Sequence, residues 1–262
     1  MNPGRIKFED AAGYDQMMGV WSQLVGNKFL EWLAPEKGQK WIDIGCGGGA
    51  FTEQLMENCA PSYLAGVDPS EDQIAFARQR PSLKTAEFKK SDAMELPFEQ
   101  NEFDAATMAL VLFFVPEPRR GIAEMIRVTK PGGSISAYVW DINNGGFPPE
   151  PIRAELKKME VDLPLPPSPH ISEMNNLESL WREFQLQNLE TQVITVSRNF
   201  NNFGEFWDIT TNSASIKAAL STLPATLLAD LREAVRDELP SNADGSITYT
   251  AFANAIKGTA NK

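Results

Sequence analysis

The sequence predicts an α/β fold with a doubly wound, mostly parallel sheet. Short apolar runs alternate with stretches of helical periodicity from about residue 40 to residue 140, as successive strand–helix–strand units require. The run at residues 103–112 is apolar on every side, which is typical of a central parallel strand covered by helices on both faces. Two more strand patterns beyond residue 180 bring the expected number of strands to seven.

The individual elements follow from apolar periodicity and from turn residues. Residues 10–33 carry apolar side chains at helical spacing, and we expect an N-terminal helix that ends at Pro35–Gly38. A capping box, in which Ser70 accepts from an amide and Gln73 reaches back, starts a helix that runs to about Arg80. Strands are predicted at residues 41–44, 63–67, 85–89, 103–112, 134–140, 189–196 and 246–256. The other predicted helices are 51–58, 121–128, 152–159, 176–184 and, with a break near Pro224, 203–238.

We expect one domain over residues 1–262, because no linker separates two self-contained halves. Residues 1–37 form a helical cap and residues 38–142 form the core, with a turn at Lys130–Gly133 before its fifth strand. Residues 143–262 begin with a proline-rich stretch and add a helical insertion between the last two strands.

Composition narrows the function. The formal net charge is −11, and a field of that sign repels phosphate backbones, so we expect no nucleic-acid partner. Two cysteines and one histidine (His170, in a loop) argue against a metal site or a Ser-His-Asp triad. No run approaches the roughly 18–20 apolar residues of a membrane span, and residues 1–10 are not a signal peptide. A cytoplasmic location is the expectation, and the oligomeric state stays open.

A glycine-rich turn, Gly45-Cys46-Gly47-Gly48-Gly49-Ala50, follows the first strand. Such a turn presents free backbone N–H groups at a helix N-terminus and lets a ligand approach closely. The turn fits the dinucleotide pattern, and Asp68 lies about 20 residues on, where a ribose ligand of NAD is expected. An NAD-dependent oxidoreductase is therefore one candidate. A P-loop is excluded, because no Gly-Lys-Ser/Thr follows the glycines.

Three aspartates at strand ends favour a different ligand. Asp43 precedes the first glycine, Asp68 ends the second strand, and Asp92 follows the third. Strand ends converge on one crevice in a doubly wound sheet, so we expect the three carboxylates around one ligand. They suit a ligand with a positive charge, two ribose hydroxyls and an exocyclic amine better than a pyrophosphate. Asp43 can orient the turn and face a cation through a bridging water.

Together these motifs resemble the class I S-adenosylmethionine (SAM) dependent methyltransferases. The resemblance is to the small-molecule type related to the ubiquinone and menaquinone biosynthesis methylases, and it covers about residues 10–141. It implies a Rossmann-like sheet whose last strand is antiparallel, and SAM as the cofactor. The matching stretches are residues 14–22, 41–52, 66–78, 91–98, 103–115 and 127–140.

The resemblance also implies residue roles on the nucleoside side of SAM. Asp68 would accept both ribose hydroxyls, with Pro69 and Ser70 along the same edge. Asp92 would accept the adenine amine, and the Ala93 amide would donate to the ring. Gln73 belongs to the helix cap or touches the ligand.

On the methionine side, the turn residues Gly45, Cys46 and Gly47 would pack against the ligand. Met108 and Ala109 would offer backbone groups at the end of the fourth strand. Tyr14 and Trp21 would close over SAM from the N-terminal helix. Cys46 is interpreted as an apolar filler rather than a nucleophile.

Four aromatic side chains are candidates for the acceptor site, namely Phe113, Trp140, Phe203 and Trp207, and core packing is the alternative for each. The expected reaction is in-line transfer of the SAM methyl group to a small, rather apolar acceptor, with no dedicated general base visible. A non-catalytic SAM-binding regulatory module is a further alternative. The sequence does not decide whether oxygen, nitrogen or carbon is methylated.

Overall fold

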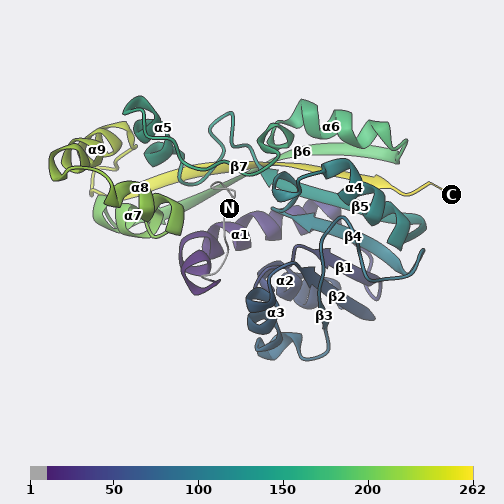
Figure 1. The fold of residues 1–262 in the computed structure, drawn as a ribbon. Helices are drawn as coiled ribbons and strands as arrows, with labels where there is room; N and C mark the ends of the chain where they lie inside the picture. Colours follow the sequence, from purple (N-terminus) through teal and green to yellow (C-terminus); the bar gives the residue numbers. More distant parts are fainter. Residues whose placement is uncertain (1–10, 262) are drawn as a thin grey trace.

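The computed structural model describes residues 11–261 of the chain, with side chains from residue 18 onward, Ala214 excepted. In this part of the chain seven strands form one sheet in the order β3-β2-β1-β4-β5-β7-β6 (Figure 1). The strands are β1 (Lys40–Ile44), β2 (Tyr63–Asp68), β3 (Glu87–Lys90), β4 (Phe103–Ala109), β5 (Thr129–Trp140), β6 (Gln187–Phe200) and β7 (Ile247–Thr259).

Strand directions confirm the predicted fold class. The four pairings among β1 to β5 are parallel, whereas β7 is antiparallel to both of its neighbours, β5 and β6. The sheet is therefore mostly parallel, with the last strand of the chain antiparallel. Because β1 to β5 are parallel, their carboxyl ends share one edge of the sheet, which is where ligands of such folds bind.

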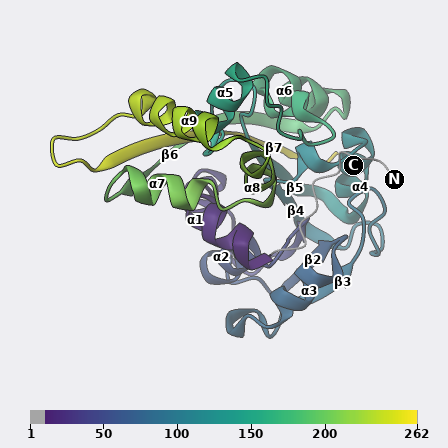
Figure 2. The same cartoon turned by 60° about the vertical axis from the view of Figure 1, so that its left-hand side comes forward.

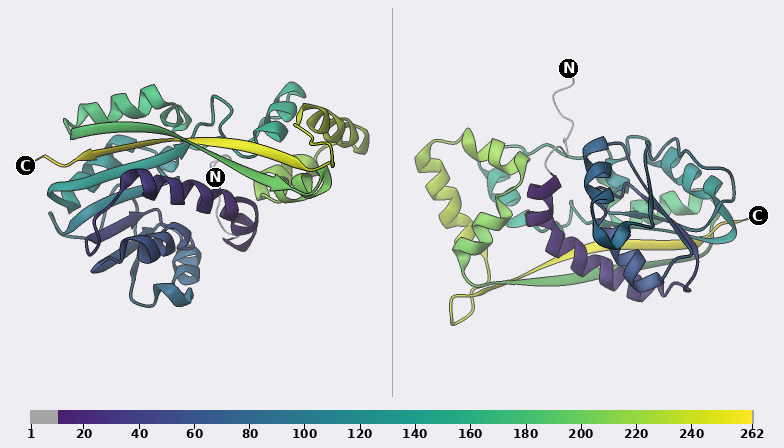
Figure 3. Two further views of the ribbon diagram at one scale, coloured as in Figure 1. Left: turned by 180° about the vertical axis from the view of Figure 1, so that it is seen from behind. Right: turned by 90° about the horizontal axis from the view of Figure 1, so that it is seen from below.

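Helices cover both faces of the sheet (Figures 1 and 3). One face carries α1 (Ala11–Leu33), α2 (Ala50–Cys59) and α3 (Glu71–Arg78), and the other carries α4 (Pro118–Val128) and α6 (Met174–Glu183). The ring centroids of Phe29 in α1 and Tyr138 in β5 lie 4.6 Å apart, so the cap helix packs directly on the sheet. Short 3₁₀ turns η1 (Pro81–Leu83), η2 (Leu112–Phe114) and η3 (Pro169–Ser172) connect these elements.

The β6–β7 pair projects beyond the carboxyl edge of the parallel strands. β5 pairs with β7 only as far as Trp140 opposite Ala253, whereas β6 follows β7 out to Phe200 opposite Ile247. Four helices gather at this projecting end, namely α5 (Glu150–Lys158), α7 (Phe203–Thr210), α8 (Ala214–Ser221) and α9 (Ala225–Glu238) (Figure 2). We call these four helices the lobe. The predicted helical insertion between the last two strands is confirmed as α7 to α9.

Two predicted boundaries are wrong for identifiable reasons. The strand predicted at residues 103–112 ends at Ala109, because Leu110 adopts a φ of 62°, which no strand can continue. The turn predicted at Lys130–Gly133 lies inside β5, which starts at Thr129 and bulges before it resumes its pairing with β4 at Ser134. Apolar periodicity carries no signal for such a bulge.

The helical insertion breaks twice rather than once. Ser213 ends the first break, because its Oγ accepts from the Ile216 amide at 3.2 Å and caps α8. The second break is the expected one at Pro224, which precedes α9. Sequence periodicity alone did not separate α7 from α8.

Candidate functional site

The glycine turn after β1 is shaped mainly by the chain's own packing. Gly45, Gly47 and Gly49 have φ of 75°, 51° and 82°, which disfavours any residue with a Cβ. A Cβ on Gly45 would lie 2.5 Å from both methyl carbons of Val111, in the loop after β4. A Cβ on Gly47 would meet nothing nearer than 3.7 Å, so the space beside Gly47 is where the turn can admit a ligand.

Asp43 lies wholly buried at the end of β1, beneath the turn. Its Oδ2 accepts a 2.7 Å hydrogen bond from the Thr52 hydroxyl in the first turn of α2, which ties strand to helix. Its Oδ1 is buried and has no hydrogen-bond partner in the described part of the chain. Burial raises the pKa of Asp43 to about 7; the Thr52 bond opposes that shift and the nearby Asp68 adds to it.

Two buried hydroxyls continue the row that Asp43 begins. Thr107 of β4 is the register partner of Asp43, and Ser136 of β5 is the register partner of Thr107. Both hydroxyl oxygens are buried without a hydrogen-bond partner among the described residues. Unpaired polar atoms in such a row suit ordered water, which fits the water-bridged role expected for Asp43.

Asp68 ends β2 and faces the same turn. Its Oδ2 accepts from the Gly47 amide at 3.1 Å and its Oδ1 from the Ser70 amide at 2.8 Å. Burial raises the pKa of Asp68, and these two amide bonds oppose the shift. Each carboxylate oxygen accepts one bond here and can accept another, so the two oxygens together can still receive two hydroxyls.

The start of α3 closes this side of the site. Ser70 is the N-cap, with its Oγ accepting from the Gln73 amide at 3.4 Å, as the capping box predicts. Gln73 is buried, and its Oε1 lies next to the positions that a Cβ on Gly47 or Gly48 would take. The Gln73 side chain therefore lies against the glycine turn. Pro69 is exposed between Asp68 and Ser70.

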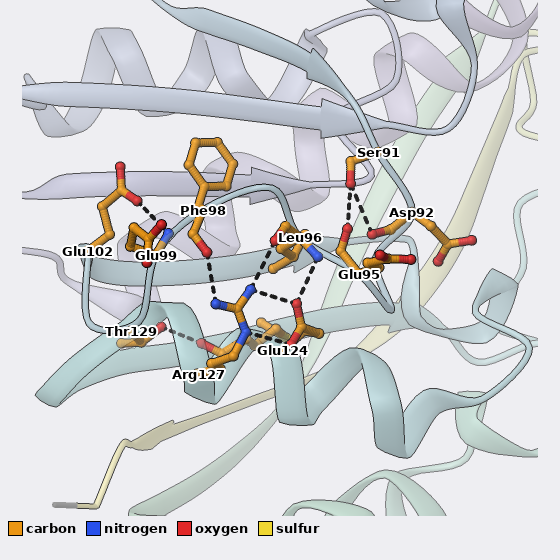
Figure 4. Close-up of polar contacts among 11 residues, drawn as sticks. Ser91, Asp92, Glu95, Leu96, Phe98, Glu99, Glu102, Glu124, Arg127 and Thr129 are labelled. Atoms are coloured by element: carbon orange, nitrogen blue, oxygen red, sulfur yellow. Dashed lines mark hydrogen bonds and ion pairs between the residues drawn. The ribbon is translucent and has the colours of Figure 1, made fainter.

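Asp92 is exposed in the loop after β3, in a tight turn (Figure 4). Its Oδ1 accepts from the Met94 amide at 2.9 Å, and its backbone bridges to Glu95. Ser91 Oγ donates to the Glu95 carbonyl at 2.6 Å, which closes the turn. Asp92, whose Oδ2 has no partner among the described residues, and the partly buried Ala93 are thus held in a defined conformation.

Two residues of α4, Glu124 and Arg127, hold the same loop in place by hydrogen bonds, and sequence reasoning missed both. Figure 4 shows the Arg127 guanidinium between Glu124 and the loop. It donates to the carbonyl oxygens of Leu96 at 2.9 Å and Phe98 at 2.8 Å, and to Glu124 at 2.6 Å. Glu124 in turn accepts from the Leu96 amide at 2.7 Å. Their mutual pairing raises the pKa of Arg127 and lowers that of Glu124, so both stay charged.

The remaining candidates on the core are buried or partly buried. Met108 is fully buried and Ala109 partly buried at the end of β4. Phe113 packs 4.4 Å from Phe114, and its carbonyl accepts from the Ser168 amide. Trp140 ends β5 with its indole Nε1 buried and unpaired in the described part of the chain.

The other candidates lie on the cap helix and the lobe. Trp21 of α1 is buried and meets the ring of Tyr249 edge-on at 6.2 Å. Phe203 and Trp207 lie on α7, with the Arg232 guanidinium above both rings at 5.7 Å and 5.5 Å. Tyr14 lies in the first turns of α1, and its side chain is outside the described residues. The structure therefore brings Asp43, the glycine turn, Asp68 and Gln73 together, and places Phe203 and Trp207 apart from them on the lobe.

Cys46 and His170 contribute no charged group to this cluster. Cys46 is buried, and burial next to the two aspartates raises the pKa of its thiol well above the usual value, so it packs as an apolar side chain. His170 is exposed in η3. Within residues 11–261 no group of three or more His, Cys, Asp or Glu side chains could hold a metal ion.

Comparison with known proteins identifies the core. The family described as a methyltransferase domain matches residues 42–137, which include the glycine turn, Asp68, Asp92 and Arg127. This stretch of the chain is a SAM-dependent methyltransferase domain. The residues present fit the family's cofactor, because Asp68 keeps free acceptor capacity beside open space at Gly47, and Asp43 keeps an unpaired oxygen.

Curated relatives of this methyltransferase align over part of their length. A chloroplastic 2-phytyl-1,4-beta-naphthoquinone methyltransferase of Arabidopsis thaliana is 34% identical over 155 residues, 55% of this chain and 59% of the relative. A demethylmenaquinone methyltransferase of Staphylococcus aureus is 35% identical over 118 residues, 44% of this chain and 47% of the relative. The matched region thus spans between about half and three-fifths of these relatives.

Solved structures share the fold of the methyltransferase. A putative methyltransferase from Bacillus halodurans aligns with a TM-score of 0.57 and 15% identity over 90% of this chain and 99% of its own. A phosphoethanolamine N-methyltransferase of Haemonchus contortus, solved with SAM, aligns with a TM-score of 0.59 and 18% identity over 96% of this chain and 57% of its own. At these identities the likeness concerns the fold alone. No helix among the described residues is long and apolar enough to cross a membrane.

Proposed function

We propose that this chain transfers a methyl group from SAM to a small, rather apolar acceptor in the cytoplasm. The observation that carries the proposal is the position of Asp68, whose carboxylate accepts a hydrogen bond from the Gly47 amide of the glycine turn and keeps acceptor capacity on both oxygens. SAM supplies an electrophilic methyl group on a sulfonium centre, and the protein supplies position and electrostatics. The names of the aligned relatives, both quinone methyltransferases, support an apolar acceptor.

The residues would divide the work as follows. Asp68 holds the ribose, with Pro69, Ser70 and Gln73 along its edge, and Asp92 with Ala93 reads the adenine. On the methionine side the contacts are Gly45, Cys46, Gly47, the backbone of Met108 and Ala109, and Asp43 through water, with Tyr14 and Trp21 closing from the cap helix.

The acceptor would then lie beyond the carboxyl end of β4 and β5, near Phe113 and Trp140, with Phe203 and Trp207 reaching it from the lobe. Chain groups that orient an acceptor in a near-attack pose can lower the barrier by roughly 7–11 kcal/mol. No general base is assigned, because the described core candidates nearest this place are apolar or buried.

Calorimetry tests the cofactor assignment. We expect S-adenosylhomocysteine (SAH) to bind the full chain and NAD not to bind; NAD binding without SAH binding would show an oxidoreductase instead. The Asp68→Ala variant should weaken SAH binding more than tenfold, because a buried charged acceptor of two hydroxyls is lost. Asp72→Ala is the matched control, since Asp72 is an exposed acid in the first turn of α3. Equal loss in both variants, or none in D68A, would refute the role of Asp68.

A methyl-transfer screen over quinols, phenols, amines and fatty acids tests the catalytic step. A blank screen with tight SAH binding would favour the alternative of a regulatory SAM-binding module.

A further inference from the structure

Arg198 has a buried nitrogen with no hydrogen-bond partner among the residues that the structure describes. It lies on β6 where the β6–β7 pair projects past the end of β5, because its register partner is Tyr249 and the last β5–β7 pair is Trp140 with Ala253. Its Nη1 is buried without a hydrogen-bond partner in the described part of the chain. A guanidinium has no neutral form to retreat to in proteins, so an unpaired buried donor there costs free energy until an acceptor arrives.

An aromatic ring lies beside Arg198, and nearby acidic groups only partly balance its positive charge. Its guanidinium carbon lies 4.9 Å above the ring of Phe200. Burial lowers the pKa of Arg198, and the charge of Glu205 opposes this, but no ion pair joins the two within the described residues. The Glu205 carboxylate instead accepts from the Asn201 amide at 2.6 Å and from its side chain at 2.8 Å.

Tyr249 places this spot at the junction of lobe and core. Its ring meets Trp21 of the cap helix at 6.2 Å and Phe206 of α7 at 5.8 Å. Burial, together with the charge of Glu150, raises the pKa of its hydroxyl to about 12, so the group stays a neutral donor. Glu150 is itself paired with Arg153 at 2.7 Å. Both nearby carboxylates are thus already bonded, whereas Arg198 Nη1 has no hydrogen-bond partner among the described residues.

Resting on the proposed function, we propose that Arg198, with Tyr249 beside it, binds a carboxylate of the methyl acceptor, so that the substrate class is small aromatic acids. The projecting pair lies on the side of the sheet from which an acceptor must approach the methyl group, beyond the carboxyl ends of the parallel strands. A guanidinium matches a carboxylate in geometry and charge. The buried rings of Trp21, Phe200 and Phe206 make the surroundings apolar, which is compatible with an acceptor that has an aromatic ring.

Matched probe pairs test this substrate class with the full-length chain. The probes are 4-hydroxybenzoate with 4-hydroxybenzamide, and 1-hydroxy-2-naphthoate with 1-hydroxy-2-naphthamide, each titrated into the chain saturated with SAH. The two members of a pair differ in charge and little in shape. We expect the acid to bind at least tenfold more tightly than the amide in at least one pair, and Arg198→Met to remove that preference. Arg198→Lys should keep part of it, because the charge stays and the planar fork is lost.

Arg236 provides the control. Its guanidinium also lies above a phenylalanine ring, that of Phe203 at 4.8 Å, but it is paired with Glu233 at 2.7 Å. Arg236→Met should therefore keep the preference for the acid. SAH affinity and the melting temperature of each variant show that the fold and the cofactor site are intact.

The outcomes separate the two proposals. Equal or undetectable binding of acid and amide by the unmodified chain, or a preference that survives in Arg198→Met, overturns the acceptor class while the SAH result stands. Failure of the unmodified chain to bind SAH overturns the methyltransferase function itself, whatever the probes do.

Discussion

Replacing Asp43 by asparagine should stabilise the folded chain increasingly as the pH rises. The pKa of Asp43 is raised from 3.8 to about 7, chiefly by burial. Between these values the folded chain keeps a proton that the unfolded chain has released, so the free energy of unfolding falls as the pH rises through this window and no further above it. Asparagine is neutral throughout and can still accept from the Thr52 hydroxyl, so the D43N variant escapes this loss.

The magnitude follows from the shift. One pKa unit corresponds to about 1.4 kcal/mol, so ionising this carboxyl in the folded chain costs up to about 4 kcal/mol. Between pH 4.5 and pH 8 the difference in unfolding free energy between D43N and the unmodified chain should rise by about 3 kcal/mol. Urea denaturation at four pH values in that range measures it, with Asp72→Asn, an exposed acid, as the control. A D43N difference that does not change with pH would refute the reasoning.

Proton release on SAH binding gives a second test of Asp43. If Asp43 faces the ammonium of the bound cofactor through water, as proposed, binding favours its ionised form. SAH binding near pH 6.5 should then release a proton from the unmodified chain and not from D43N. Calorimetry in two buffers of different ionisation enthalpy detects the proton, and identical proton release by both chains would remove Asp43 from the cofactor site.

Three further perturbations test other parts of the site. Gly45→Ala should lower the free energy of unfolding by about 2–5 kcal/mol, because it adds a methyl group 2.5 Å from the Val111 methyl carbons at a position of positive φ. Gly38→Ala, at a φ of 80° with nothing within 4 Å, should lower it by only about 1 kcal/mol. Urea denaturation measures both variants. Arg127→Met should weaken SAH binding roughly tenfold and lower the free energy of unfolding by about 1–2 kcal/mol. Arg120→Met breaks an exposed ion pair on the same helix and should change SAH binding and stability little. Equal effects of the two substitutions would refute the role of Arg127 in holding the loop. Cys46 should resist iodoacetamide at pH 8 in the folded chain and react in urea, as mass spectrometry of the labelled peptides would show; labelling of the folded chain would contradict its burial.

The fold was predictable because the apolar periodicity, the helix caps and the turn residues of the sequence all indicate the same elements. The unbroken apolar run of β4, the capping box at Ser70 and the glycines after β1 are local signals, and the structure confirms the element that each predicts. The bulge at the start of β5 and the end of β4 at Leu110 were not predictable, because a positive φ on leucine reflects tertiary packing rather than propensity.

The site was predictable only where strand ends are marked by charge. Asp43 and Asp68 converge on the glycine turn because parallel strands end at one edge. The role of Arg127 was missed because its contacts to the loop are with backbone carbonyls about 30 positions away, which no side-chain pattern encodes. Thr52 carried a weak signal, nine positions after Asp43 in the first turn of the next helix.

The projecting β6–β7 pair has a consequence for how such a chain can change over evolutionary time. The lobe helices between Phe200 and Ile247 are joined to the rest at the tip of the pair, whereas the β5–β7 register is set further along, from Ala253 to Thr259. A longer, shorter or quite different insertion there would leave every one of those pairings in place. The part of acceptor recognition proposed for Phe203 and Trp207 could therefore diverge by exchange of one contiguous segment, while the half of the molecule that holds the cofactor is inherited unaltered.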